Sequence, residues 1–98
     1  MTQVLIVATP PGEAPEWVRK EWVGLTMPVA KNVPSRTYLA GVVSGRKADQ
    51  FTSGYIIETR IALQILKEKN AGAYQWWVGN VSPMPPWLVF DSCACQLL

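Results

Sequence analysis

The chain has 98 residues and a net charge of +2, with 49% hydrophobic and 16% charged residues. This length holds one domain, so we expect a single globular domain over residues 1–98, and the composition is too apolar for an intrinsically disordered protein. The small net charge excludes a strong electrostatic field. The sequence has no histidine, which removes the commonest general base and the commonest metal ligand.

The first half of the chain predicts strands around one short helix. Thr2–Thr9 is an apolar, β-rich run, which is typical of a central strand. Pro15 suits the first turn of a helix, which we expect to continue to Trp22. Alternation of apolar and small or polar residues over Val23–Val29 predicts a half-buried strand, and a second strand is expected over Ser35–Ser44.

The second half predicts two helices and a last strand. Gly45–Gly54 is polar and typical of a loop. A helix is expected from near Glu58 to Asn70, because its apolar residues form a stripe. A shorter helix is expected over Ala73–Val78, and a long final strand over Trp87–Leu98.

The helices cluster between the strands and do not alternate with them, which favours an α+β fold. We expect an antiparallel or mixed sheet of about four strands with two or three short helices. The alternative is a small SH3-like barrel with helical insertions.

Aromatic residues are the candidate binding residues, because five tryptophans are many for so short a chain. Adjacent indoles at positions 76 and 77 point about 100° apart on a helix, and those at positions 17 and 22 also cannot face the same way. Some indoles should therefore line a cleft or anchor an interface, or else lie at the rim of the core. The candidate ligand- or partner-binding residues are Trp17, Trp22, Tyr74, Trp76, Trp77 and Trp87.

Basic side chains gather in one stretch that has no acidic residue between them, namely Lys31, Arg36, Arg46 and Lys47. The simpler interpretation is a solvated strand pair with its loop. The alternative is an anion or nucleic-acid patch, because binding a phosphate backbone needs clustered cations. Nucleic acid is the less favoured partner.

Cys93 and Cys95 are the one reactive-looking group. On a strand their Cα atoms would lie about 6.6 Å apart on one face, near the upper limit of disulfide geometry. No other cysteine or histidine exists to complete a zinc site. The acidic residues are scattered, and no glycine-rich phosphate loop is visible. We therefore expect core thiols, no catalytic residues, no metal and no cofactor.

Targeting signals are weak. No run of about 18 apolar residues exists to span a membrane, and Val4–Ala8 is too short for a signal peptide, so we expect a cytoplasmic protein without a membrane partner. The segment from Pro83 to Pro86 has the spacing of a polyproline ligand, although a rigid turn is the simpler interpretation.

The run Pro11-Gly12-Glu13-Ala14-Pro15-Glu16-Trp17-Val18-Arg19, followed by Trp22-Val23-Gly24-Leu25, resembles the opening of small bacterial proteins with no assigned activity. The Trp76-Trp77 pair extends the likeness, which covers about a third of the chain. The resemblance implies a bacterial origin and carries no site residues with it.

These observations favour a non-enzymatic binding module that uses an aromatic-lined pocket or surface for a small molecule or a protein partner. The alternative is a homo-oligomeric accessory protein, with a homodimer as its simplest form. A weak nucleic-acid-binding protein is the third hypothesis.

Overall fold

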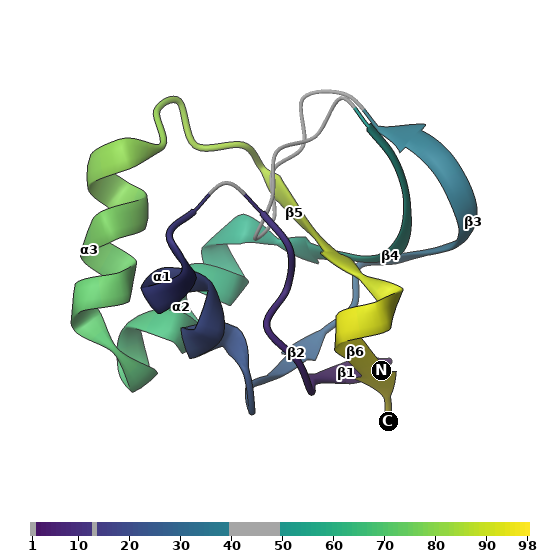
Figure 1. Cartoon of the computed structure of the whole chain (residues 1–98), viewed down its shortest axis with the longest axis horizontal. Coiled ribbons are helices and arrows are strands. Elements are labelled where there is room, and N and C mark those ends of the chain that lie inside the picture. Colours follow the sequence, from purple (N-terminus) through teal and green to yellow (C-terminus); the bar gives the residue numbers. More distant parts are fainter. Residues whose placement is uncertain (1, 13, 40–49) are drawn as a thin grey trace.

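The described part of the chain folds into two three-stranded antiparallel sheets and three α-helices (Figure 1). The computed structural model describes residues 2–12, 14–39 and 50–98, and for residues 34–39 and 50–52 it describes the backbone alone. The elements in chain order are β1 (Gln3–Ile6), α1 (Glu16–Arg19), the 3-10 helix η1 (Lys20–Trp22), β2 (Thr26–Pro28), β3 (Lys31–Leu39), β4 (Gln50–Glu58), α2 (Thr59–Lys69), α3 (Ala71–Asn80), β5 (Trp87–Asp91), the 3-10 helix η2 (Ser92–Ala94) and β6 (Cys95–Leu97). The fold is α+β, as the sequence predicts.

The chain passes twice from one sheet directly into the other. The strand orders are β2-β1-β6 and β3-β4-β5, and every pair is antiparallel. Only Val29 and Ala30 separate β2 from β3, and η2 alone separates β5 from β6. The Ala30 amide still donates to the Ile56 carbonyl at 2.8 Å, so the pairing with β4 begins as soon as β2 leaves β1.

The single sheet of about four strands is not confirmed, because the strands divide into two sheets. The SH3-like barrel is likewise not confirmed. The expected strand over Trp87–Leu98 is wrong in the middle, where η2 interrupts it. The interruption buries Ala94, whose carbonyl accepts from the Val7 amide at 2.8 Å. This turn lets β5 pair with β4 while β6 pairs with β1.

Other strand boundaries also differ from the prediction, since β1 ends at Ile6 and not at Thr9, and β2 begins at Thr26 and not at Val23. The polar segment Gly45–Gly54 was expected to be a loop, but β4 already begins at Gln50. Similarly, β3 begins at Lys31 and not at Ser35, and residues 40–44 of the strand expected over Ser35–Ser44 lie outside the described residues. Strand preference depends on pairing and burial more than on the local residue types. The pairing between β3 and β4 therefore extends both strands into these polar segments.

The core lies between the sheets and the helices. Trp22 is fully buried, with its ring 5.0 Å from Phe90 and 6.0 Å from Trp77, both edge to face. Helix α2 buries Ala62, Leu63 and Leu66 beside them, whereas Ile61 and Ile65 of the expected stripe are only half-buried. The remaining members of the buried cluster come from β1, α1, β2, β4, α3 and β5, and from Ala14 just before α1.

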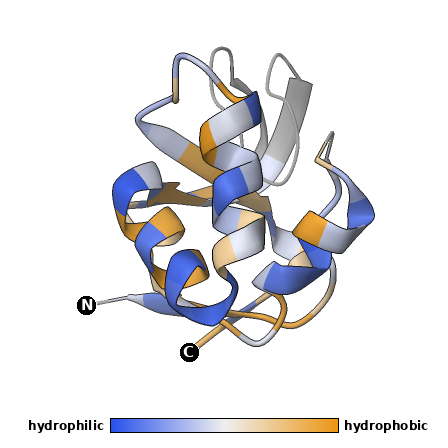
Figure 2. Cartoon of the chain, turned by 90° about the vertical axis from the view of Figure 1, so that its left-hand side faces the viewer, coloured by the Kyte–Doolittle hydropathy of each residue, from blue (hydrophilic) through white to orange (hydrophobic). Residues whose placement is uncertain are grey.

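The helices gather on one side of the molecule, at the left in Figure 1 and in front of the sheets in Figure 2. The turn between α2 and α3 is fastened to the end of η1. Lys69 Nζ donates to the carbonyls of Glu21 and Val23, both at 2.8 Å. Asn70 caps α3 by accepting from the Ala73 amide at 3.1 Å, and it donates to Glu21 Oε1 at 2.8 Å. The helical insertion between β4 and β5 is thus held against the sheets.

Among the residues that the structure describes, none belongs to a helix long and apolar enough to cross a membrane.

Candidate functional site

The predicted aromatic residues do not come together in one site. Trp22 and Trp77 belong to the core, with 0% and 1% of their surface exposed. Trp76 is half-buried, with its ring 5.8 Å from that of Trp77. Trp17 on α1 and Trp87 at the start of β5 are 49% and 39% exposed. The spacing argument therefore holds for both pairs of indoles, since in each pair one indole is buried and the other is not.

The other predicted residues add little to a site. Tyr74 is half-buried and lies under Lys67, whose Nζ is 5.0 Å from the centre of its ring. Lys31 is exposed at the start of β3, and the backbone of Arg36 follows in the same strand. Arg46, Lys47 and the side chain of Arg36 lie outside the described residues, so the predicted anion patch stays a prediction, of which the structure describes only the side chain of Lys31.

Trp87 is the exposed aromatic residue around which the surface is hollowed. Three hollows of about 390, 380 and 240 Å³ adjoin one another there. The first two share Trp87, the first and third share Glu58, and the second and third share Ala30. We call this surface the Trp87 groove, lined by Pro28, Val29, Ala30, Lys31, Ile56, Glu58, Thr59, Arg60, Ile61, Leu63, Met84, Pro85, Pro86 and Trp87.

Strand pairing positions the centre of the groove. Glu58 and Trp87 are directly opposite each other in the antiparallel β4–β5 pair, so their side chains project from the same face of the sheet. Ile56 lies two residues earlier on that face, opposite both Val89 and Lys31. The opposite face carries Ile57 and Leu88 into the core. Trp87 therefore belongs to the outer face of the β3-β4-β5 sheet.

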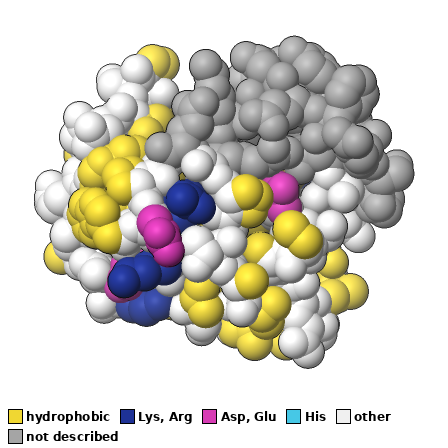
Figure 3. Space-filling model, in the orientation of Figure 1, with side chains coloured by type: hydrophobic (Ala, Val, Ile, Leu, Met, Phe, Trp, Pro, Cys, Tyr) yellow, Lys and Arg dark blue, Asp and Glu magenta, His cyan; other side chains and the backbone are white. Residues whose placement is uncertain are grey.

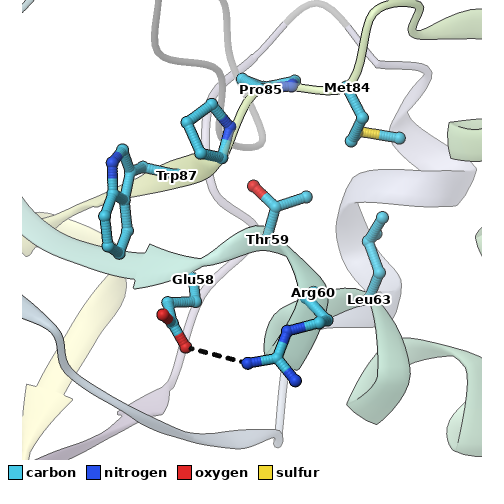
Figure 4. Close-up of a pocket in the computed structure, with 8 residues that line it drawn as sticks. Glu58, Thr59, Arg60, Leu63, Met84, Pro85 and Trp87 are labelled. Carbon is cyan, nitrogen blue, oxygen red and sulfur yellow. Dashed lines mark ion pairs between the residues drawn. The ribbon is translucent and has the colours of Figure 1, made fainter.

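The first hollow is a cleft between the start of α2 and the segment that leads into β5 (Figure 4). Leu63 and Met84 stand on the side away from Trp87. The Thr59 amide donates to the Pro86 carbonyl at 3.0 Å, which ties the two walls together. Because prolines have a fixed backbone φ, Pro85 and Pro86 give the indole a stiff support.

The polar groups of the first hollow lie at the N-terminus of α2. Thr59 is 4% exposed, and its Oγ1 is buried without a hydrogen-bond partner. Glu58 is the N-cap residue, but its side chain makes no capping hydrogen bond. Its Oε2 lies 3.7 Å from the guanidinium of Arg60, and these side chains are 39% and 85% exposed. Such an exposed pair is weak, so Arg60 remains accessible to a ligand.

The two cysteines lie in different surroundings, and neither lines the Trp87 groove. Cys93 is exposed in η2 and Cys95 is half-buried at the start of β6, so they do not share one strand as predicted. Burial, and then the charges of Asp91 and Cys93, raise the pKa of Cys95 to about 12. A thiol with a raised pKa is a poor nucleophile. No group of three metal-binding side chains is found among the described residues.

Most of the groove was not predicted from the sequence. No sequence motif marks Thr59, Arg60, Leu63 or Met84. Of the aromatic residues predicted to bind a ligand or partner, only Trp87 lines the groove. The signal that points to it is Pro85-Pro86 directly before Trp87, since two rigid residues before an aromatic one present it in a fixed position. From the sequence alone, a rigid turn was the simpler interpretation of those prolines.

Comparisons of the chain with models of known protein families, with curated proteins and with solved structures gave no match. They therefore lend no support to the resemblance to small bacterial proteins or to the bacterial origin that it implies.

Proposed function

We propose that this chain is a non-enzymatic binding module whose Trp87 groove receives a short extended segment of a partner protein. The observation that carries the proposal is the position of Trp87, which is 39% exposed and lines two adjoining hollows. Tryptophans in such positions supply much of the energy of protein interfaces, because a large, stiff apolar ring gains contact area at little cost in entropy.

The shape of the groove favours an extended segment over a compact ligand. Ligand pockets typically measure about 300–1,000 Å³. The hollows of about 390 and 380 Å³ lie at the low end of this range and the third, of about 240 Å³, lies below it, but the three adjoin around Glu58 and Trp87. Alternate side chains of an extended chain lie about 6.6 Å apart. Two side chains of such a segment fit neighbouring hollows with Trp87 between them.

The groove is built on rigid elements, which favours binding without rearrangement. Trp87 begins β5, where the next residue Leu88 is fully buried, and Pro86 before it is bonded to α2. A side chain that is already held in its bound position loses less entropy on binding.

Its side chains also favour recognition over catalysis. Lys31, Glu58 and Arg60 are the charged groups that line the groove, and Glu58 faces Arg60. The chain contains no imidazole, and burial raises the pKa of Cys95 to about 12, which keeps this thiol protonated well above neutral pH. This chemistry suits positioning a ligand more than transferring protons.

The strand pairing also supports the finer proposal of an SH3-like barrel with a helical insertion. In this proposal β2 continues into β3 as one bent strand, and β5 continues into β6 as another, so that both sheets share these two bent strands. The central strand is β1 in one sheet and β4 in the other. Such barrels host many functions, so the binding proposal depends on the groove and not on the barrel.

A display experiment tests the function. A library of displayed random dodecapeptides is selected on the immobilised protein. The enriched peptides are then synthesised, and their affinity for the protein is measured by calorimetry. We expect Trp87→Ala to weaken binding at least tenfold, because the indole forms the wall between two hollows. Trp17→Ala is the matched control, since Trp17 is at least as exposed as Trp87 but lines none of the three hollows. Failure to enrich any peptide whose binding depends on Trp87 would contradict the proposal.

Self-association is the second candidate, favoured by the surface of α3. No charged residue occurs from Asn70 to Phe90, Val78 on α3 is 50% exposed, and apolar side chains gather over this helix (Figure 3). A patch of this kind is typical of protein interfaces. Light scattering over a range of concentrations distinguishes the candidates, because a strict monomer at the highest concentration removes self-association while leaving the Trp87 groove untouched.

A further inference from the structure

We propose that the first hollow of the Trp87 groove binds the free C-terminal carboxylate of the partner segment at the N-terminus of α2. This inference rests on the proposed function, because it names the end of the ligand that the same groove recognises.

Thr59 provides the first argument. Its side chain is almost wholly buried, its Oγ1 has no hydrogen-bond partner, and it lines the hollow. Figure 4 shows the hydroxyl directed toward Pro85 and Trp87, on the side where the hollow lies. Buried polar groups are nearly always satisfied, so an unsatisfied one indicates a missing partner. The other described orphan atoms, the Nε1 atoms of Trp22 and Trp77, belong to the aromatic core.

The first turn of α2 provides the second argument. The first amides of a helix have no acceptor within the helix. Here the Thr59 amide donates to the Pro86 carbonyl, but the N-cap residue Glu58 offers no capping hydrogen bond to the amides that follow. These amides and the helix dipole favour a negatively charged acceptor.

Arg60 supplies the charge. Its guanidinium is 85% exposed and lies 3.7 Å from Glu58 Oε2, too far for a strong paired hydrogen bond. A ligand carboxylate can accept from Arg60 with better geometry than this pair has. Glu58 opposes the ligand as a like charge, so removing the charge of Glu58 should tighten binding.

The walls of the hollow select a chain end. Leu63 and Met84 bound the hollow on the side away from Trp87 (Figure 4). A segment that enters past Trp87 therefore meets an apolar wall, beside the unpaired Thr59 hydroxyl and the first amides of α2. A terminal carboxylate stops at this point, whereas a continuing chain would have to leave the hollow.

The test compares free-acid and amidated peptides. Dodecapeptides displayed with free C-termini are selected on the protein, and those whose binding depends on Trp87 are synthesised as the acid and as the C-terminal amide. By calorimetry the amide should bind at least tenfold more weakly. Thr59→Val and Arg60→Gln should each weaken the acid about fivefold and the amide little, and Glu58→Gln should tighten the acid.

Two controls separate recognition from structure. Thr59→Ser keeps the hydroxyl and should keep the preference for the acid, whereas Thr59→Val removes an unsatisfied buried group and should remain folded by circular dichroism. Lys20→Gln removes an equal charge at an exposed site on η1 and should leave both affinities unchanged.

The two proposals fail in distinguishable ways. Trp87-dependent peptides that bind equally well as acid and amide overturn the carboxylate site and leave the binding module standing. A preference for the acid that Thr59→Val does not reduce overturns the assignment to α2. The absence of any Trp87-dependent peptide overturns both.

Discussion

Replacement of Trp22 by alanine is the sharpest test of how this small core is built. Trp22 is fully buried and is packed edge to face against Phe90 and Trp77. Truncating a buried tryptophan costs about 3–5 kcal/mol, and the loss of two aromatic pairs places Trp22→Ala near the upper end of that range. A domain of this size has a free energy of unfolding of about 5–15 kcal/mol. The variant should therefore lose about a third or more of this free energy, and it is close to unfolding at 25 °C if the wild-type protein lies at the lower end of the range.

Urea denaturation followed by far-ultraviolet circular dichroism measures this change without relying on the indole that is removed. Trp17→Ala is the matched control, because it deletes the same side chain from the preceding turn at a site 49% exposed. We expect its free energy of unfolding to change by only about 0.5 kcal/mol. If Trp22→Ala gives no folded baseline, Trp22→Phe supplies the comparison. It keeps an aromatic ring, deletes the unsatisfied Nε1–H group and should cost less than the alanine variant.

Similar losses of stability in the two alanine variants would contradict this expectation. That result would mean that the helix surface near Trp17, and not the contact of Trp22 with Phe90 and Trp77, supplies the stabilisation.

The remaining predictions concern a glycine and the two thiols. Gly54→Ala should lower the free energy of unfolding by about 3 kcal/mol or more, because its Cβ would lie 3.0 Å from Asp91 Cα and closer still to the Phe90 carbonyl; a urea midpoint like that of wild type would disprove this close approach of β4 and β5. At pH 8 iodoacetamide should modify exposed Cys93 much faster than Cys95, as peptide mass spectrometry would show, and equal rates would contradict the raised pKa of Cys95. Because the pKa of Cys95 is higher in the folded state, its contribution to the free energy of unfolding is fully present below the ordinary thiol pKa of 9.0 and is lost as the pH rises toward about 12. The free energy of unfolding of Cys95→Ala should therefore fall less steeply with pH over this range than that of wild type.

Sequence patterns predicted the elements whose cause is local. The stop at Asn70 and the spacing of apolar residues located α2 to within a residue or two, because helix ends depend on neighbouring groups. The same angular geometry correctly separated the indoles of each pair into one buried and one not. The interruption of the last strand by η2 was missed, since it depends on Ala94 meeting Val7 from the other end of the chain.

The sequence by itself determined that the fold is α+β, that imidazole chemistry is absent and that some indoles must reach the surface, since composition and rotation per residue decide these things within each segment. Only the tertiary structure decided that Trp87 centres the groove. The walls of the groove come from residues 28–31, 56–63 and 84–87, which meet because strand pairing and burial join segments far apart in the chain. Local spacing sets the direction of a side chain, but the element that packs beside it depends on the whole fold.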